Sequence, residues 1–475
     1  MIDIWHDIVR LRAEIAYPLG LILAILVTTH VLLEKREVAS AAGWIGLVWF
    51  APTLGAIAYA VLGVNRVQRR AQRLRLPNQA VDGARPAGPA AGDDDHLDPL
   101  ARGIGRITGR PLLGANTIET FHDGDGAYPP MLDAIAKAQR SVGLSSYIFR
   151  NDVWGSRFIE ALAEAQGRGV AVRVIVDGVG GGWLRSAAYH HLRRRGVPAA
   201  RFMHSLLPWR MPFLNLRSHK KILVVDGRLG FTGGVNIAAQ NVLAEHPDSP
   251  VQDTHFRIQG PIVCQLVAAF AQDWTFVANE ELDGDAWFPP LQAHGAAPAR
   301  IIDSGPDEDI EKIEFAVLEA IACARSRIMV LTPYFLPDER LLSTLSLAAI
   351  RGVAVDVVVP EISDHRLVAW AMLANSRPLL RDGVRIWRCP PPFRHSKVVL
   401  VDDEWVLIGS ANWDIRSFRL NFELCMELYD RDLASSLATL IQGYMAKPIT
   451  EAELDARGIP QRLRDAAARL LLPYL

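Results

Sequence analysis

The stretch "RSHKKILVVDGRLGFTGGVN", residues 217–236, decides the fold, because its pattern returns in "RHSKVVLVDDEWVLIGSAN", residues 394–412. Each copy has a histidine and a lysine two positions apart, then four apolar residues and an aspartate, and later Gly-[Gly/Ser]-x-Asn. Residues i and i+2 of a strand point to the same face, so the histidine and lysine of each copy are predicted to project together. The apolar run predicts a buried strand, and the aspartate begins the turn of a hairpin.

The two copies lie in two halves of similar plan. Residues 128–178 predict a helix, a strand, a helix and a buried strand, and residues 310–361 repeat this order. The pentapeptide RGVAV occurs once in each of these segments. We therefore predict an α/β fold in which duplicated βαβ domains, residues 104–292 and 293–475, form one pseudo-twofold catalytic unit. Residues 76–103 are rich in Pro, Gly, Ala and Asp without a hydrophobic period, which predicts a flexible linker.

Two long apolar runs precede the duplicated part. Residues 15–33 contain no Asp, Glu, Lys or Arg, and neither do residues 41–64. Each run is long enough to cross a hydrocarbon core of about 30 Å as a helix. Arginines gather directly after the second run, and cationic flanks stay on the cytoplasmic side of a membrane. We therefore predict a two-helix transmembrane hairpin with a basic flank within residues 1–75, and a catalytic domain that faces the cytoplasm.

The composition narrows the classes of function. Half of the residues are hydrophobic and 22% are charged, which is typical of a folded protein. The formal net charge of −1 argues against a globally basic nucleic-acid binder. The four cysteines are scattered, and buried free thiols are predicted for them. The sequence contains neither an HExxH motif nor a Cys/His ligand spacing, so no metal site is predicted.

The repeated motif predicts a phosphate-handling pocket, formed where the two copies meet. The predicted catalytic residues are His219, Lys221, Asp226, His395, Lys397 and Asp402, and the predicted phosphate-binding residues are Asn236, Ser410 and Asn412. Cations and amide donors suit a tetrahedral phosphate, whose charge spreads over several oxygens in the transition state. One imidazole can attack phosphorus while the other protonates the leaving alkoxide, and the residues alone do not tell which does which.

The two motifs resemble those of the phospholipase D superfamily, whose members work through a phosphohistidine intermediate without a metal. Within the superfamily the chain resembles the bacterial cardiolipin synthases, through its two apolar runs and through "QDTHFRIQGPIV", "TPYFLPD" and "NWDIRSFRLNFE". This resemblance implies an enzyme that transfers a phosphatidyl group from one phosphatidylglycerol to another and releases glycerol. It further implies a multi-pass protein of the bacterial cytoplasmic (inner) membrane, with lipid partners, no nucleic acid and no cofactor.

The resemblance also implies roles for individual residues. His219 would be the nucleophile, and His395 the acid that then becomes the base for the incoming alcohol. A carboxylate is expected behind each histidine, and Asp253 and Glu423 fit that role. The chain departs from many cardiolipin synthases in one respect, since "NIAAQNVLAEHPDSP", from residue 236, lacks an Asp-Glu pair. The identity of the acceptor alcohol is therefore left open.

Other functions share part of this pattern. A phospholipase D that hydrolyses phospholipids to phosphatidic acid would use the same residues, as would a transferase with another acceptor alcohol. A nuclease is disfavoured by the two apolar runs, and an inactive scaffold by the completeness of both motifs. The amphipathic tail "LRDAAARLLLPYL", from residue 463, favours packing against the domain, with contact to lipid as the alternative. The oligomeric state is not predicted.

Overall fold

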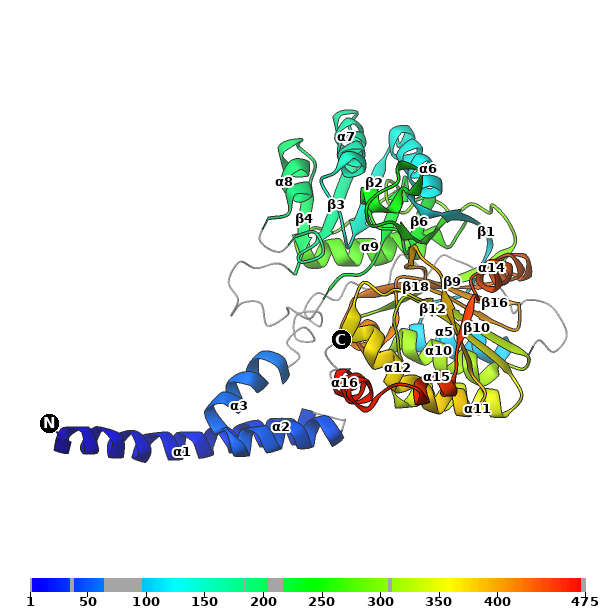
Figure 1. Cartoon of the computed structure of the whole chain (residues 1–475). Coiled ribbons are helices and arrows are strands. Elements are labelled where there is room, and N and C mark those ends of the chain that lie inside the picture. Colours follow the sequence, from blue (N-terminus) through cyan, green and yellow to red (C-terminus); the bar gives the residue numbers. More distant parts are fainter. Residues whose placement is uncertain are drawn as a thin grey trace. The chain divides into compact units, whose positions relative to one another are not determined.

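The computed structural model describes residues 2–34, 38–63, 96–182, 185–203, 217–305 and 310–470. The chain divides into two compact units. One, the N-terminal unit, consists of residues 1–70 with 208–212, and the other, the α/β unit, holds the rest of the chain (Figure 1).

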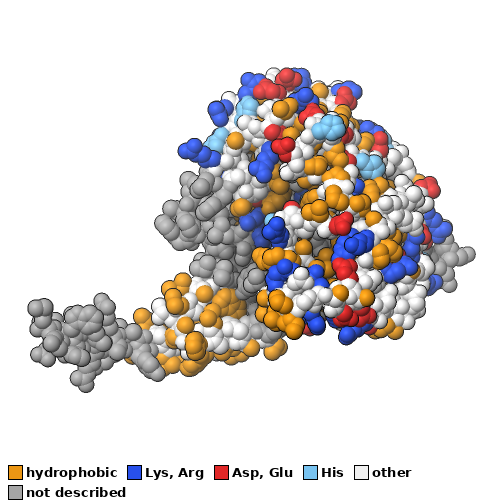
Figure 2. All heavy atoms as spheres, in the orientation of Figure 1, with side chains coloured by type: hydrophobic (Ala, Val, Ile, Leu, Met, Phe, Trp, Pro, Cys, Tyr) orange, Lys and Arg blue, Asp and Glu red, His pale blue; other side chains and the backbone are white. Residues whose placement is uncertain are grey.

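The N-terminal unit is helical in its described residues. Its elements are α1 (Ile2–Glu34), α2 (Val38–Phe50), α3 (Pro52–Ala58) and the π-helical turn η1 (Tyr59–Gly63). The first apolar run lies within α1, whereas the second is divided at Ala51, where Pro52 starts a new helix because it has no N–H to continue α2. Hydrophobic side chains dominate the described surface of this unit (Figure 2). None of the helices in the described parts of the chain combines the length and the apolar character that crossing a bilayer requires.

The first half of the α/β unit follows the predicted alternation of helices and strands. Its elements are α5 (Asp98–Thr108), β1 (Leu113–His122), α6 (Asp123–Lys137), β2 (Ser141–Ser146), α7 (Val153–Gly167), β3 (Ala171–Asp177), α8 (Ala187–Arg194), β4 (Ala199–Phe202), β5 (Ile222–Val225), β6 (Leu229–Gly233), η4 (Ala239–Asn241), η5 (Leu243–Glu245), β7 (Val251–Gln252), β8 (Thr254–Gln259) and α9 (Val263–Ala278).

The second half repeats this order. Its elements are β9 (Ala297–Ser304), α10 (Lys312–Cys323), β10 (Arg327–Leu331), β11 (Phe335–Leu336), α11 (Glu339–Ile350), β12 (Ala354–Pro360), α12 (Arg366–Arg381), β13 (Arg385–Cys389), β14 (Phe393–Arg394), β15 (Val398–Val401), β16 (Trp405–Gly409), β17 (Trp413–Asp414), α13 (Ile415–Arg419), β18 (Glu423–Tyr429), α14 (Arg431–Gly443), β19 (Lys447–Ile449), α15 (Glu451–Asp455) and α16 (Ile459–Arg469).

One 15-stranded sheet runs through both halves, in the order β19-β13-β12-β10-β15-β16-β18-β9-β1-β8-β6-β5-β2-β3-β4. Apart from the edge strand β19, which has no counterpart in the first half, the order is symmetric about the β9–β1 pair. From the outside inward, each half contributes three parallel strands, an antiparallel hairpin, one further strand and one strand of the central pair. The hairpins β5–β6 and β15–β16 carry the repeated motif, and their strands are buried except at Leu229, which is half-buried. The predicted duplicated α/β fold is therefore confirmed, and the two halves form a single compact unit.

Helix α5 corrects the prediction of a flexible linker over residues 76–103. Leu97, Leu100 and Ile104, three and four positions apart, are buried in the same core as α10 of the second half. This apolar face was overlooked among the Pro, Gly and Asp residues around it, and Pro99 is tolerated in the first turn of a helix. The linker prediction is wrong for residues 98–103, and residues 76–95 lie outside the described part of the chain.

Each half of the sheet packs helices on its faces. Helices α6, α7 and α8 share the core of the first half, and α9 packs on the strands from the other side, where Gly143 leaves room for Phe270 (Figure 1). The four cysteines are free thiols, of which Cys264, Cys389 and Cys425 are buried and Cys323 is half-buried, as predicted for three of them. The sheet thus presents the starts of β5 and β15 as the rigid base of the candidate site.

Candidate active site

Both motif histidines lie at the junction of the two halves. His219 stands three residues before β5, and its backbone N–H donates to the carbonyl of Phe422 in the other half, at 2.9 Å. His395 is held the same way, since its N–H donates to the carbonyl of Gln252 at 2.7 Å, and β14 pairs with β7. The two imidazole ring centroids are 6.1 Å apart with nearly perpendicular planes. The halves therefore bring the two histidines close together, as the repeated pattern predicts.

The lysines of the motif lie on the same side as the histidines. Tyr147 contacts both partners of the first copy, with its ring centroid 4.9 Å from the ring of His219 and 5.5 Å from the Lys221 ammonium. Lys220, between them in the sequence, points the other way and forms a buried ion pair of 2.9 Å with Asp273 on α9. The ammonium groups of Lys221 and Lys397 each donate to the backbone carbonyl of the histidine two residues earlier. The predicted period-2 alternation is thus observed at the first motif.

The carboxylates behind the histidines are exchanged between the halves. His219 Nδ1 lies 3.0 Å from Oε2 of Glu423, and His395 Nδ1 lies 2.7 Å from Oδ2 of Asp253. An ionised carboxylate only accepts hydrogen bonds, so it holds the imidazole proton on Nδ1 and leaves the Nε2 lone pair available. The structure therefore brings the predicted carboxylates to the histidines, each supplied by the opposite half.

The two carboxylates have different surroundings. Ser410 Oγ donates to Oε2 of Glu423 at 2.5 Å, and Asn421 Nδ2 donates to its other oxygen at 3.0 Å. Gly234 takes the place of Ser410 in the first copy, where a Cβ atom would lie only 2.0 Å from the carboxylate of Asp253. The first copy therefore has glycine where the second has serine, because the carboxylate of Asp253 lies too close to the backbone for a side chain at position 234. The structure also corrects the prediction for Ser410, whose hydroxyl is engaged with Glu423 and with the backbone of Leu424 rather than turned toward a phosphate.

The pKa values of these groups follow from burial and from the charges around them. Burial raises the pKa of Glu423 to about 7, against the hydrogen bond from Ser410. The pKa of Asp253 is lowered, because the attraction of His395 and its hydrogen bond outweigh the burial that would raise it. Burial and the nearby lysines lower the pKa of both histidines, that of His219 well below its ordinary value. His219 is therefore neutral at physiological pH and can act as a nucleophile.

The two motif lysines are buried in the same pocket. Burial, with the repulsion of Lys397, lowers the pKa of Lys221 to about 7. Burial also lowers the pKa of Lys397 to about 8, against the attraction of Asp253 and Glu423. An entering phosphate anion would favour the charged form of both ammonium groups.

The two motif asparagines differ in their hydrogen bonds. Asn236 Oδ1 accepts from the backbone N–H of Ile148 at 3.1 Å, which leaves the side-chain amide N–H groups for other partners. Asn412 is buried, and its Oδ1 atom has no hydrogen-bond partner among the described residues. The amide N–H groups of Asn236 can therefore donate to an oxyanion in the pocket, whereas the unpartnered Oδ1 atom of Asn412 can only accept.

Asp226 and Asp402 are not brought to the histidines. Each begins the hairpin turn at the far end of β5 or β15, with φ of 53° and 54°. Asp402 accepts from the backbone N–H groups of residues 325–327 at 2.7 to 2.9 Å, and Asp226 does the same with residues 139–141. These donors, acting against burial, lower the pKa of Asp402 to about 2. The prediction of a catalytic role is corrected here, because both carboxylates anchor the hairpin to the preceding helix–strand junction.

Aromatic residues around the histidines were missed by sequence reasoning. Tyr147 follows the end of β2, and Phe393 in β14 lies with its ring centroid 6.1 Å from that of His395. Tyr334 follows β10, and its ring lies 6.4 Å from that of Phe393. A usable signal exists for the tyrosines, because ligand sites of α/β proteins lie beyond the carboxyl ends of parallel strands. Within the described residues, no group of three His, Cys, Asp or Glu side chains could hold a metal ion.

Fold and site together define a class: phosphodiester-transfer proteins of the phospholipase D type, in which a duplicated sheet pairs two histidines across its centre. The chain matches the family "Cardiolipin synthase, PLD-like domain" over residues 131–274 and 317–445, and "Phospholipase_D-nuclease N-terminal" over residues 22–63. It is 34% identical to cardiolipin synthase A of Pseudomonas putida, over 97% of this chain and 98% of the relative. It is 30% identical to cardiolipin synthase 2 of Staphylococcus epidermidis, over 98% of each chain.

A solved structure shows the same fold. Phosphatidylserine synthase of Haemophilus influenzae is similar with a TM-score of 0.60 and 15% identity, over 80% of this chain and 100% of that chain. The chain belongs to the family of cardiolipin synthases with phospholipase D-like domains.

Proposed function

We propose that this protein joins two phosphatidylglycerol molecules into cardiolipin and releases glycerol, through a phosphohistidine intermediate. The observation that carries the proposal is the pair of imidazoles with ring centroids 6.1 Å apart, each with Nδ1 on a carboxylate of the opposite half. This spacing suits a phosphorus atom between two Nε2 atoms. The names of the relatives, cardiolipin synthases over nearly the whole chain, support the choice of substrate.

In the first step, Nε2 of His219 attacks the phosphorus of one phosphatidylglycerol. The bond from phosphorus to the headgroup glycerol breaks, and His395 donates a proton to the departing oxygen. Two observations support this order. Asp253, whose pKa is lowered, remains an anion that stabilises an imidazolium at His395 against the burial that lowers the pKa of His395 itself. The pKa of His219 is well below its ordinary value, so His219 is neutral. Lys221 and Lys397, with the motif asparagines, bind the phosphoryl oxygens.

In the second step, neutral His395 takes the proton from a headgroup hydroxyl of the second phosphatidylglycerol. That oxygen attacks phosphorus, and the bond from phosphorus to Nε2 of His219 breaks. Cardiolipin leaves, and both imidazoles return to their starting protonation states. The reaction consumes no cofactor, because over the two steps one phosphorus–oxygen bond breaks and another forms, while the phosphorus–nitrogen bond forms and breaks again.

We also propose that residues 15–33 and 41–64 anchor the enzyme in the bacterial inner membrane as a hairpin, with the α/β unit in the cytoplasm. Support comes from the two charge-free runs, from the arginines after the second run, and from the exposed apolar side chains of α1, α2 and α3. Protease protection of terminal tags in spheroplasts tests the topology. A tag at either end that is cleaved from outside the cytoplasmic membrane would contradict it.

The reaction is tested with purified enzyme and phosphatidylglycerol that carries a label in its headgroup glycerol. Cardiolipin together with free labelled glycerol supports the proposal. Phosphatidic acid as the main product would favour a hydrolase, and transfer only to an added alcohol would favour another acceptor. Since the loop after Asn236 departs from the Asp-Glu pattern of many relatives, the added alcohols should include glycerol and ethanolamine-type headgroups.

A further inference from the structure

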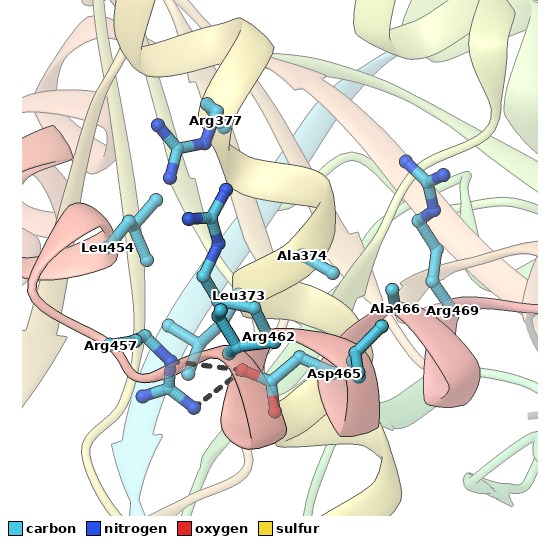
Figure 3. Close-up of a pocket in the computed structure, with 11 residues that line it drawn as sticks. Leu373, Ala374, Arg377, Leu454, Arg457, Arg462, Asp465, Ala466 and Arg469 are labelled. Carbon is cyan, nitrogen blue, oxygen red and sulfur yellow. Dashed lines mark hydrogen bonds and ion pairs between the residues drawn. The ribbon is translucent and has the colours of Figure 1, made fainter.

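The α/β unit has a second concave surface, between α12 and α16. The groove measures about 490 Å³ and is lined by apolar side chains of both helices and of α15, among them Leu373, Leu454 and Leu463. Four arginines surround it, and Figure 3 shows them on both sides of the groove: Arg377, Arg457, Arg462 and Arg469. Asp465 is the one acidic residue among the described residues that line this groove. Such a combination of apolar floor and cationic rim suits an amphiphilic anion.

Helix α16 is fixed on the domain by one face and open on the other. Buried Asp465 accepts hydrogen bonds from Arg457 at 3.0 Å and from Arg464 at 2.8 Å, and Arg464 lies 4.2 Å from the ring centroid of Trp370 on α12. The opposite face carries a stripe at helical spacing. Ile459, Leu463 and Leu470 are 72%, 66% and 76% exposed. The predicted packing of the tail is therefore observed for residues 463–470, but it leaves an apolar stripe in solvent, and residues 471–475 lie outside the described part of the chain.

The charges beside this stripe are only partly compensated. Arg457 pairs with Asp465, and Arg377 pairs with Asp455 at 2.7 Å. Arg462 and Arg469, which flank the stripe, have no carboxylate within ion-pair distance among the described residues. Long arginine side chains can hold phosphate at headgroup level while neighbouring apolar residues enter the acyl boundary.

The same surface continues toward the candidate active site. Helix α12 begins two residues after Asp364, whose carboxylate accepts a hydrogen bond of 2.8 Å from the Tyr334 hydroxyl near Phe393. From there, Leu367, Trp370, Ala374 and Arg377 follow one face of α12 at spacings of three and four residues. Leu367 is 44% exposed. One face of α12 therefore joins the aromatic rim of the pocket to the groove.

We propose that the α16 surface, formed by Ile459, Leu463, Leu470, Arg462 and Arg469, docks the α/β unit on an anionic phospholipid bilayer. Charge complementarity favours this occupant, because arginines without an ion-pair partner among the described residues flank an apolar stripe, the arrangement of helices that lie in a membrane interface. Docking here would present a lipid surface to the mouth of the pocket. The inference adds a lipid contact to the proposed function and does not depend on the reaction chemistry.

The test uses the full chain with one fluorophore on the stripe. Cys323→Ser removes the one cysteine that is not buried, and Leu463→Cys then carries an environment-sensitive label. The protein is reconstituted into vesicles of phosphatidylcholine alone or of phosphatidylcholine with an equal amount of phosphatidylglycerol, both with brominated acyl chains. Leu347→Cys, on α11 and 56% exposed, is the matched control. We expect quenching of the label at position 463, and not at 347, only when phosphatidylglycerol is present.

A charge variant tests the role of the arginines. Arg462→Gln with Arg469→Gln should weaken docking by about 30-fold, since each arginine near an anionic surface contributes about 1 kcal/mol. Arg193→Gln with Arg194→Gln on α8, both exposed, makes the same change in net charge and should leave quenching unaltered.

Three results would overturn the proposal. A label at position 463 that is shielded equally in detergent and in both vesicles would indicate that residues 471–475 cover the groove. Shielding in detergent that rises with protein concentration would indicate a second copy of the chain. Equal quenching with and without phosphatidylglycerol would show that docking does not depend on the anionic headgroups. Cardiolipin formation in detergent micelles, measured on each variant, reports folding and the reaction separately from docking. If the unaltered chain forms no cardiolipin in micelles but its label is still quenched in vesicles, the proposed function is refuted and the docking proposal stands.

Discussion

Replacing Ser410 with alanine removes a donor from one of the two histidine–carboxylate pairs, and it also removes the acceptor of the Leu424 backbone N–H, which lies 3.0 Å from the Ser410 hydroxyl. The Ser410 hydroxyl donates to Glu423 at 2.5 Å, and Glu423 in turn lies 3.0 Å from Nδ1 of His219. This hydrogen bond opposes the effect of burial on the pKa of Glu423, which stands at about 7. Its loss should raise that pKa further. A protonated Glu423 would donate to Nδ1 and move the imidazole proton to Nε2, which then cannot attack phosphorus.

The size of the effect follows from the hydrogen bond. A bond to a charged group contributes about 1.5 to 3 kcal/mol, or roughly one to two pKa units. A rise from about 7 to between about 8 and 9 lowers the ionised fraction of Glu423 at pH 7 by roughly 5- to 50-fold. We expect kcat/KM at pH 7 to fall by that factor. At high pH, where Glu423 is ionised in both proteins, the rates should converge.

The assay is the rate of cardiolipin formation in detergent micelles, measured from pH 5.5 to 9.5 in steps of about half a unit, fine enough to resolve a shift of one pKa unit. Ser396→Ala is the matched control, because Ser396 is a buried motif serine whose hydroxyl has no hydrogen-bond partner among the described residues. Its profile should coincide with that of the unaltered enzyme. If the Ser410→Ala profile coincides as well, the Ser410–Glu423–His219 relay does not set the activity, and the reasoning is refuted.

Three further results are expected. Acid quenching during turnover should trap labelled phosphate on a histidine, and His219→Ala should lose both the label and the activity; an active His219→Ala enzyme would exclude the double displacement. Gly234→Ser should lower stability by about 2 kcal/mol in urea unfolding and abolish activity, because its Cβ would lie 2.0 Å from the carboxylate of Asp253; an unchanged midpoint would contradict this packing. Asp402→Asn should lower stability by about 2 kcal/mol while the folded enzyme keeps its kcat, since the carboxylate anchors a turn; a large loss of kcat at full stability would restore its catalytic role. In the unaltered protein, the stability that Asp402 contributes is fully present above the ordinary aspartate pKa and is lost as pH falls through the folded pKa of about 2. A comparison of acid unfolding between Asp402→Asn and the unaltered enzyme would show this loss.

Much of the fold follows from patterns within short stretches of the chain. The apolar runs after His219 and His395 predict buried strands, and β5 and β15 are fully buried. Repetition of the helix–strand order predicts a duplicated sheet, and the strand order is symmetric about the β9–β1 pair apart from the edge strand β19. Helix α5 was not predicted from the sequence, because its buried apolar residues stand among residues typical of loops.

The candidate site was predicted less evenly. The histidines and lysines of the motif could be found from their spacing, whereas Asp226 and Asp402 share that spacing for a different reason. Their φ values near +54° and their backbone hydrogen bonds show that the motif needs them to close a turn. Tyr147 and Phe393 belong to no repeated motif in the sequence, so only the assembled structure shows that they lie beside the histidines.

The sequence by itself determined that a histidine and a lysine, two positions apart, precede each of two buried strands and project together, because the alternation of side chains along a strand is a local property of the backbone. Only the tertiary structure decided how the sets are combined. His219 takes its carboxylate from a residue 204 positions away, and His395 from one 142 positions away in the opposite direction. Such contacts depend on how the two halves of the sheet meet at β1 and β9. The same junction explains why Ser410 and Gly234 differ. The carboxylate of Glu423 leaves room for the Ser410 side chain, whereas the carboxylate of Asp253 leaves no room for a Cβ atom at position 234.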